Sequence, residues 1–182
     1  QQVMATTEIL LAGFGGQGVL FAGKILAYCG LMDNKELSWL PSYGPEMRGG
    51  TANCSVCISD EPIGSPLVLT PDILIAMNQP SFDKFIGDLK PGGKVFYDST
   101  LIEADCSRTD IEIFPVASSQ LADDNALKGG SNIILLGKVI KETGVFSLET
   151  MKKAIEKVLK IKVVELSTDP QLMGALGAAE YA

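Results

Sequence analysis

Residues 8–26 read EILLAGFGGQGVLFAGKIL, and this stretch decides the fold of the chain. The apolar run at 8–12 is typical of a short buried strand, and the longer apolar run after the glycines is typical of a packed helix. Between the two runs, Gly13, Gly15 and Gly18 fit the pattern G-x-G-x-x-G, which indicates a dinucleotide-binding turn when a strand precedes it and a helix follows. The stretch therefore predicts a Rossmann-like α/β fold.

The glycines of this turn are expected to have separate roles. Gly13 permits the tight turn, Gly15 and Gly16 let a ligand or another backbone come close, and Gly18 lets the helix pack on the strand. The free N–H groups at the start of the helix would suit a phosphate. The alternative is that the glycines only make a tight turn between strand and helix.

The second half of a dinucleotide fingerprint is weak here. It requires an acidic residue about 20 positions on, at the end of the second strand, to hold a ribose hydroxyl. Asp33 and Glu36 stand near that spacing, but they precede the next predicted strand, LSWLPSYG at 37–44, which Pro41 and the breaker Tyr43-Gly44-Pro45 are expected to end. The sequence therefore does not favour an NAD site, and contact of the turn with a phosphate or with a neighbouring subunit stays open.

The rest of the chain alternates predicted strands with predicted helices. This alternation indicates an open, mostly parallel sheet with helices on both faces. Hydrophobic residues make up 46% of the 182 residues, enough for a real core. No repeat or linker is present, so we expect a single domain over residues 4–182.

The segment TANCSVCIS, residues 51–59, alternates small apolar and polar residues with a period of two. This pattern predicts a half-buried strand. Cys54 and Cys57 form a C-x-x-C within it, a spacing associated with redox and metal sites. A separation of three along a strand places the two thiols on opposite faces, so we interpret them as two unrelated cysteines, with Cys54 facing inward.

Composition excludes several kinds of function. The chain has a net charge of −7 and no histidine, and its lysines and arginines are scattered, which argues against a nucleic-acid interface. The absence of histidine removes Ser-His and Cys-His nucleophile schemes. We find no membrane-spanning run, no secretion signal, no cluster of cysteines for iron–sulfur or other metals, and we expect a reducing cytoplasm.

Arg48 is the only arginine in the first hundred residues, and Gly49 and Gly50 follow it on a predicted loop, GPEMRGG. The guanidinium group suits a phosphate or a carboxylate. A salt bridge at the surface or with a partner carboxylate is an equally good interpretation from the residues alone.

Four segments, which follow one another in a fixed order along the chain, resemble the γ subunit of the 2-oxoacid:ferredoxin oxidoreductases. The resemblance is strongest over residues 8–102 and looser from there to the end. The four segments are GFGGQGVLFAGKIL, SWLPSYGPEMRGGTANCSVCISDEPIGSPLV, PDILIAMNQPSFDKF and LKPGGKVFYDSTLI. The form PSYGPEMRGGTANC is most similar to the 2-oxoglutarate branch. The resemblance implies a Rossmann-like γ domain in an enzyme that converts a 2-oxoacid and CoA to an acyl-CoA and CO₂, with electrons passed to ferredoxin, or the reverse.

The resemblance also implies the cofactors and partners. Thiamine diphosphate would lie between α and β subunits, iron–sulfur clusters would lie elsewhere in the complex, and a ferredoxin-like δ subunit is possible in such assemblies. Arg48, Gly49 and Gly50 would lie near the CoA phosphates. The chain lacks the Gly-Asp-Gly signature of thiamine diphosphate sites and a ferredoxin-type cysteine run, so we expect a non-catalytic subunit. The alternative is a free-standing NAD(P)-binding protein.

Overall fold

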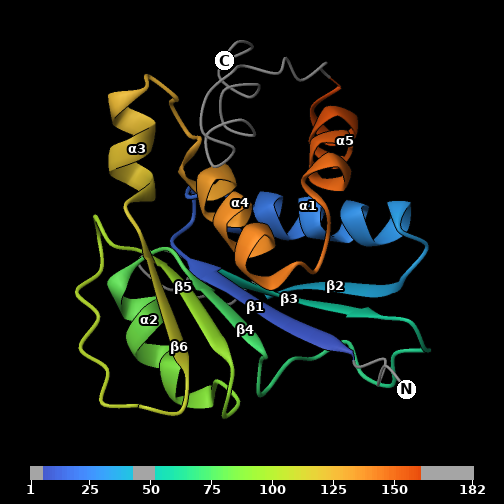
Figure 1. Cartoon of the computed structure of the whole chain (residues 1–182), viewed down its shortest axis with the longest axis horizontal. Helices are drawn as coiled ribbons and strands as arrows, with labels where there is room; N and C mark the ends of the chain where they lie inside the picture. The colour runs from blue at the N-terminus through green and yellow to red at the C-terminus, as the bar shows by residue number, and fades with distance from the viewer. Residues whose placement is uncertain (1–5, 43–51, 161–182) are drawn as a thin grey trace.

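The computed structural model describes residues 6–42 and 52–160. Its centre is one six-stranded sheet with the order β2-β3-β1-β4-β5-β6 (Figure 1). The strands are β1 (Thr7–Gly13), β2 (Glu36–Ser42), β3 (Ala52–Ser59), β4 (Ile73–Ala76), β5 (Lys94–Asp98) and β6 (Glu112–Val116).

The sheet is mostly parallel, as predicted. The pairs β1–β4, β4–β5 and β5–β6 are all parallel. β3 is the exception, because it runs antiparallel to both of its neighbours, β1 and β2. The sheet is therefore mixed, with a β2–β3 pair joined to the parallel strands through β3.

Helices cover both faces of the sheet, which confirms the predicted architecture. The helices are α1 (Val19–Met32), α2 (Gln79–Phe85), α3 (Ser118–Asp124), α4 (Ser131–Thr143) and α5 (Leu148–Leu159), with a 3₁₀ turn, η2 (Ile86–Asp88), after α2. Figure 1 shows α1, α4 and α5 on one side of the sheet and α2 on the other. We call these sides the α1 face and the α2 face. No helix within the described ranges is long and apolar enough to cross a bilayer.

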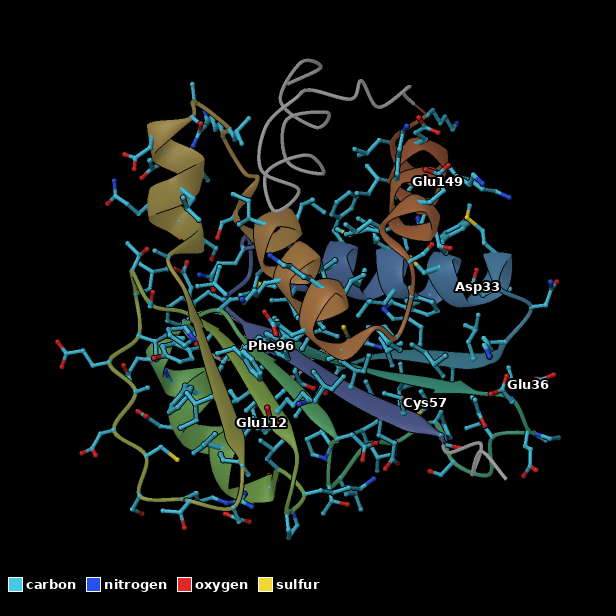
Figure 2. All side chains as sticks on the ribbon, viewed as in Figure 1. Asp33, Glu36, Cys57, Phe96, Glu112 and Glu149 are labelled. Atoms are coloured by element: carbon cyan, nitrogen blue, oxygen red, sulfur yellow. The ribbon has the colours of Figure 1, made fainter. Side chains whose placement is uncertain are left out.

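Two cores follow from the alternation of side chains along the central strands. Ile9 and Leu11 of β1 point to the α1 face, and Leu10 points to the α2 face. On the α1 face Phe96, labelled in Figure 2, stacks on Phe114 with ring centroids 4.6 Å apart. Because these strands are buried on both faces, they are continuous apolar runs in the sequence.

The prediction that 51–59 is half-buried was wrong in one respect. Cys54 and Cys57 do lie on opposite faces, in the two separate cores. Three residues of the side expected to face water are nevertheless buried, because Ser55, Cys57 and Ser59 are at most 4% exposed, whereas Asn53 on the same side is half-buried. The reason is that the chain after β3 returns across the α2 face, where Val68 donates its backbone N–H to Ser55 Oγ at 3.4 Å.

Pro41 does not end its strand, contrary to that part of the prediction, and the breaker Tyr43-Gly44-Pro45 lies outside the described residues. Pro41 lies within β2 and pairs with Cys54 of β3. β2 is at the edge of the sheet, and an edge strand tolerates a residue that has no N–H to donate.

Candidate functional site

The candidate site lies where β1 and β4 end side by side. α1 follows β1 on one face, and α2 follows β4 on the other (Figure 1). In open α/β sheets, connections that diverge in this way leave a crevice at the carboxyl ends of the strands, and ligands bind there. The glycine turn (13–18) and the residues after β4, Met77 and Asn78, meet at this point.

The structure revises part of the roles predicted for the glycines. A Cβ at Gly13 would lie 2.8 Å from Gln17 Oε1 within the turn, in agreement with the predicted tight turn, and 2.9 Å from Met77 Cβ, so Gly13 also lets the end of β4 come close. Gly16 and Gly18 have φ values of 93° and 76°, which side-chain-bearing residues rarely adopt. Gly18 precedes α1, and a Cβ there would meet Asn132 of α4, not the strand. Gly15 and Gly16 are exposed with open space at their Cβ positions, as a turn that receives a ligand requires.

Gln17 holds the turn in place, a role that the sequence analysis did not assign. Its Oε1 accepts the backbone N–H of Phe14 at 2.7 Å, and its Nε2 donates to the backbone carbonyl of Met77 at 2.8 Å. The side chain therefore fixes the turn internally and ties it to the end of β4. This role can be recognised only in the folded structure, because Met77 is 60 residues from Gln17 in the sequence.

Asn78 contributes a buried amide to the same edge. Its Oδ1 accepts the N–H of Ser81 at 2.8 Å and so caps α2. The side chain is only 3% exposed, yet among the described residues its Nδ2 has no hydrogen-bond partner, and neither has Ser81 Oγ. Unsatisfied buried polar groups are rare because they are costly. Asn78 Nδ2 is therefore an unsatisfied donor in the interior beside the end of β4.

A small hollow of about 150 Å³ opens beside the turn. Its walls come from the starts of α1, α3 and α4 and from the residue after β4, and they consist of Gly16, Gln17, Gly18, Met77, Ser119, Gly129, Ser131 and Asn132. Two helices of 14 and 13 residues thus point their N-terminal ends toward one space. That arrangement favours an anionic group.

Asp98 stands behind the hollow at the end of β5. It is 1% exposed and accepts hydrogen bonds from Thr100 N at 3.1 Å and from Ser131 Oγ at 3.4 Å. It also accepts from both the backbone N–H and the hydroxyl of Ser119. Since Ser119 and Ser131 line the hollow, this buried carboxylate orients the two hydroxyls. The sequence analysis did not identify it.

The cysteines are arranged as isolated thiols. All four are free, and Cys29, Cys54 and Cys57 are buried. Burial raises the pKa of Cys54 to about 12 and that of Cys29 to about 12, and it also raises the pKa of Cys57. Such thiols are poor nucleophiles at neutral pH. Within 6–42 and 52–160, no three His, Cys, Asp or Glu side chains gather as a metal site would require.

The second predicted segment cannot be placed beside the first. Arg48, Gly49 and Gly50 lie outside the described residues. Gly13, Gly15, Gly16 and Gly18 do come together at the sheet edge, so that part of the predicted site forms one local structure.

The fold and this edge define a Rossmann-like α/β module whose glycine turn faces a small anion-favouring hollow. The chain matches the family model for pyruvate ferredoxin/flavodoxin oxidoreductase over residues 8–169. It is 41% identical over 158 residues to the 2-oxoglutarate synthase subunit KorC of Methanocaldococcus jannaschii, covering 85% of this chain and 84% of that subunit. The chain therefore belongs to the pyruvate ferredoxin/flavodoxin oxidoreductase family.

Two further relatives show which kind of subunit the chain resembles within that family. It is 40% identical to the ketoisovalerate oxidoreductase subunit VorA of Methanothermobacter marburgensis, over 89% of this chain but only 36% of VorA. The keto/oxoacid ferredoxin oxidoreductase γ subunit of Geobacter sulfurreducens has the same fold, with a TM-score of 0.72 and 30% identity over 94% of this chain and 98% of that one. These matches confirm the predicted γ-type subunit and disfavour the free-standing NAD(P)-binding protein.

Proposed function

We propose that this chain is the γ-type subunit of an enzyme that converts 2-oxoglutarate and CoA to succinyl-CoA and CO₂, with electrons passed to ferredoxin, or runs the reverse reaction. The observation that carries this proposal is the 41% identity to a 2-oxoglutarate synthase subunit over most of both chains. The choice of 2-oxoglutarate as the substrate goes further than membership of the family, because a ketoisovalerate oxidoreductase subunit carries a similar segment.

The chain serves this enzyme as a non-catalytic subunit, a single γ-type domain over residues 4–182. It has no histidine, and three of its four thiols are buried. Thiamine diphosphate and the iron–sulfur clusters belong to the α and β subunits and to a ferredoxin-like δ subunit where one exists. Free thiols suit a cytoplasmic complex.

The glycine turn borders the entry of CoA in this proposal. CoA carries phosphate groups, and the helix N-termini at the hollow favour anions. Gly15 and Gly16 leave the backbone open to a ligand. Arg48, Gly49 and Gly50 supply the second contact to the phosphates, through the fork of the guanidinium group.

A pull-down tests the assignment to this enzyme. The tagged chain is purified from its native host under anaerobic conditions, and the eluate is assayed for reduction of a viologen dye that depends on both 2-oxoglutarate and CoA. We expect the activity to travel with larger subunits that contain thiamine diphosphate and iron. Activity with ketoisovalerate or pyruvate in place of 2-oxoglutarate would correct the substrate, and a chain without partners or activity would refute the proposal.

Substitution of Arg48 tests the CoA contact in the assembled enzyme. We expect Arg48→Ala to raise KM for CoA about tenfold or more with a smaller change in KM for 2-oxoglutarate, because a charge-assisted contact to phosphate is lost. Arg48→Lys keeps the positive charge but loses the forked guanidinium group. Its KM for CoA should therefore lie between those of the wild type and of Arg48→Ala. An unchanged KM for CoA in Arg48→Ala would remove this loop from the CoA site.

A further inference from the structure

The chain between β3 and β4 presents leucines to solvent on the α2 face. Val68 is 5% exposed and packs into the core of that face, whereas its two neighbours Leu67 and Leu69 are 51% and 70% exposed. The hydrogen bond from Val68 N to Ser55 Oγ fixes this arrangement, with the central residue turned inward and its neighbours outward. Large apolar side chains held outward beside one another indicate a surface that is covered in the working protein.

These leucines border a groove of about 310 Å³. Its buried floor includes Leu10 and Val68, and Leu40 of the edge strand β2 and Phe85 of α2 stand on its other sides. The groove exists because the two faces of the β2–β3 pair are covered differently. On the α1 face α1 packs against both strands, but on the α2 face, within 6–42 and 52–160, the irregular segment after β3 contacts β3 in place of a helix.

The groove also carries a negative charge at its border. Asp88, in the 3₁₀ turn after α2, lines it and is exposed. Among the described residues, no lysine or arginine forms an ion pair with Asp88. A complementary surface would therefore be apolar at its centre and cationic where it meets Asp88.

We propose that this groove is the docking surface for the larger subunit of the complex, the one that corresponds to the part of VorA outside the present match. The inference rests on the proposed function. In VorA the matching region makes up 36% of one longer chain, so the remainder is attached covalently. The present chain, as a separate subunit, has to bind the counterpart of that remainder through its surface. The groove supplies the apolar part of that contact.

A second copy of this chain fits the groove less well. A two-fold interface pairs residue i of one copy with residue j of the other, so it would have to seat the leucines of each copy in the other's groove, and the described residues that line the groove include no lysine or arginine to pair with Asp88. A projecting apolar segment with a lysine or arginine beside it, on a different subunit, fills the groove and pairs the charge.

The test is co-expression of the full chain with that larger subunit, with association measured by co-purification and by surface plasmon resonance. We expect the double variant Leu67→Glu/Leu69→Glu to weaken association about tenfold or more, and Asp88→Lys to weaken it by a smaller factor. The matched control is Leu31→Glu, because Leu31 is 58% exposed at the end of α1, away from the groove. All variants should keep the thermal midpoint of the wild-type chain.

Each outcome has a distinct meaning. Wild-type affinity in the double variant, or an equal loss in Leu31→Glu, would overturn the groove as the docking surface while leaving the γ-subunit assignment intact. A wild-type chain that fails to bind the larger subunit would contradict the proposed function itself. A wild-type homodimer that the double variant abolishes would identify a second copy as the occupant and refute the proposal.

Discussion

Gly18 combines two constraints that no other residue type can satisfy. Its φ is 76°, and a Cβ at this position would lie 2.1 Å from Asn132 Nδ2. Asn132 cannot easily move away, because it is 5% exposed and donates to the carbonyl of Gly18. We expect Gly18→Ala to lower the free energy of unfolding by about 1–3 kcal/mol, measured by urea denaturation.

Gly15 is the control for that experiment. Its Cβ position has nothing within 4 Å, and its φ is not in the positive range. Gly15→Ala should therefore leave the free energy of unfolding within about 0.5 kcal/mol of the wild type. Equal losses in the two variants would contradict the separate roles that the structure gives these glycines.

The residues that complete the site were beyond sequence analysis for a physical reason. The glycines could be predicted because their spacing encodes a local turn. Gln17 and Asp98 act through partners that are distant in sequence: Met77 lies 60 residues from Gln17, and Ser131 lies 33 residues from Asp98. A glutamine in a turn and an aspartate at a strand end have no pattern that distinguishes them from solvated residues.

At the scale of single elements, α5 owes its start to one side chain. Ser147 Oγ accepts the N–H of Thr150 at 3.0 Å, which is the hydrogen bond of an N-cap. We expect Ser147→Ala to lower the free energy of unfolding by about 1 kcal/mol, which corresponds to roughly 2–4 °C in Tm for a chain of this size. Calorimetry would measure the shift.

Ser147→Asp is the matching variant, because aspartate caps a helix as well as serine does and its charge suits the helix N-terminus. It should keep the wild-type Tm within about 1 °C. A loss equal to that of Ser147→Ala would show that the hydroxyl acts through something other than the cap, such as its contact with Thr150 Oγ1.

Element positions were more predictable than element surroundings. The strand at 51–59 has a clean alternating pattern, and the structure places a strand at Ala52–Ser59. The pattern could not reveal that the following segment would bury its polar side, because serine and cysteine are small enough to be buried without a large apolar surface. Pro41 misled for a similar reason, since its effect depends on whether its strand lies at an edge.

At the scale of the whole molecule, the inserted strand β3 removes the usual dinucleotide site. In that site a parallel second strand beside β1 ends in a carboxylate. Here the antiparallel β3 stands beside β1 and sets Ala52 opposite Gly13. β2 lies one strand further away, by about 4.8 Å, and ends at Ser42.

We therefore expect no saturable binding of NAD⁺ or NADP⁺ by the isolated chain at micromolar concentrations, measured by isothermal titration calorimetry. Binding in that range would correspond to about −8 kcal/mol. Such binding, lost in Gly18→Ala, would contradict the conclusion that the glycine turn serves another ligand.

The strand order also has a consequence for synthesis on the ribosome. β1 emerges before the other strands of this sheet, yet it lies in the interior of the sheet between β3 and β4. A nascent chain that ends before β3 contains neither of the strands that pair with β1, so this apolar segment stays unpaired in the sheet until β3 has been made. The glycine turn reaches its final shape only when Met77, 60 residues after Gln17, has left the exit tunnel.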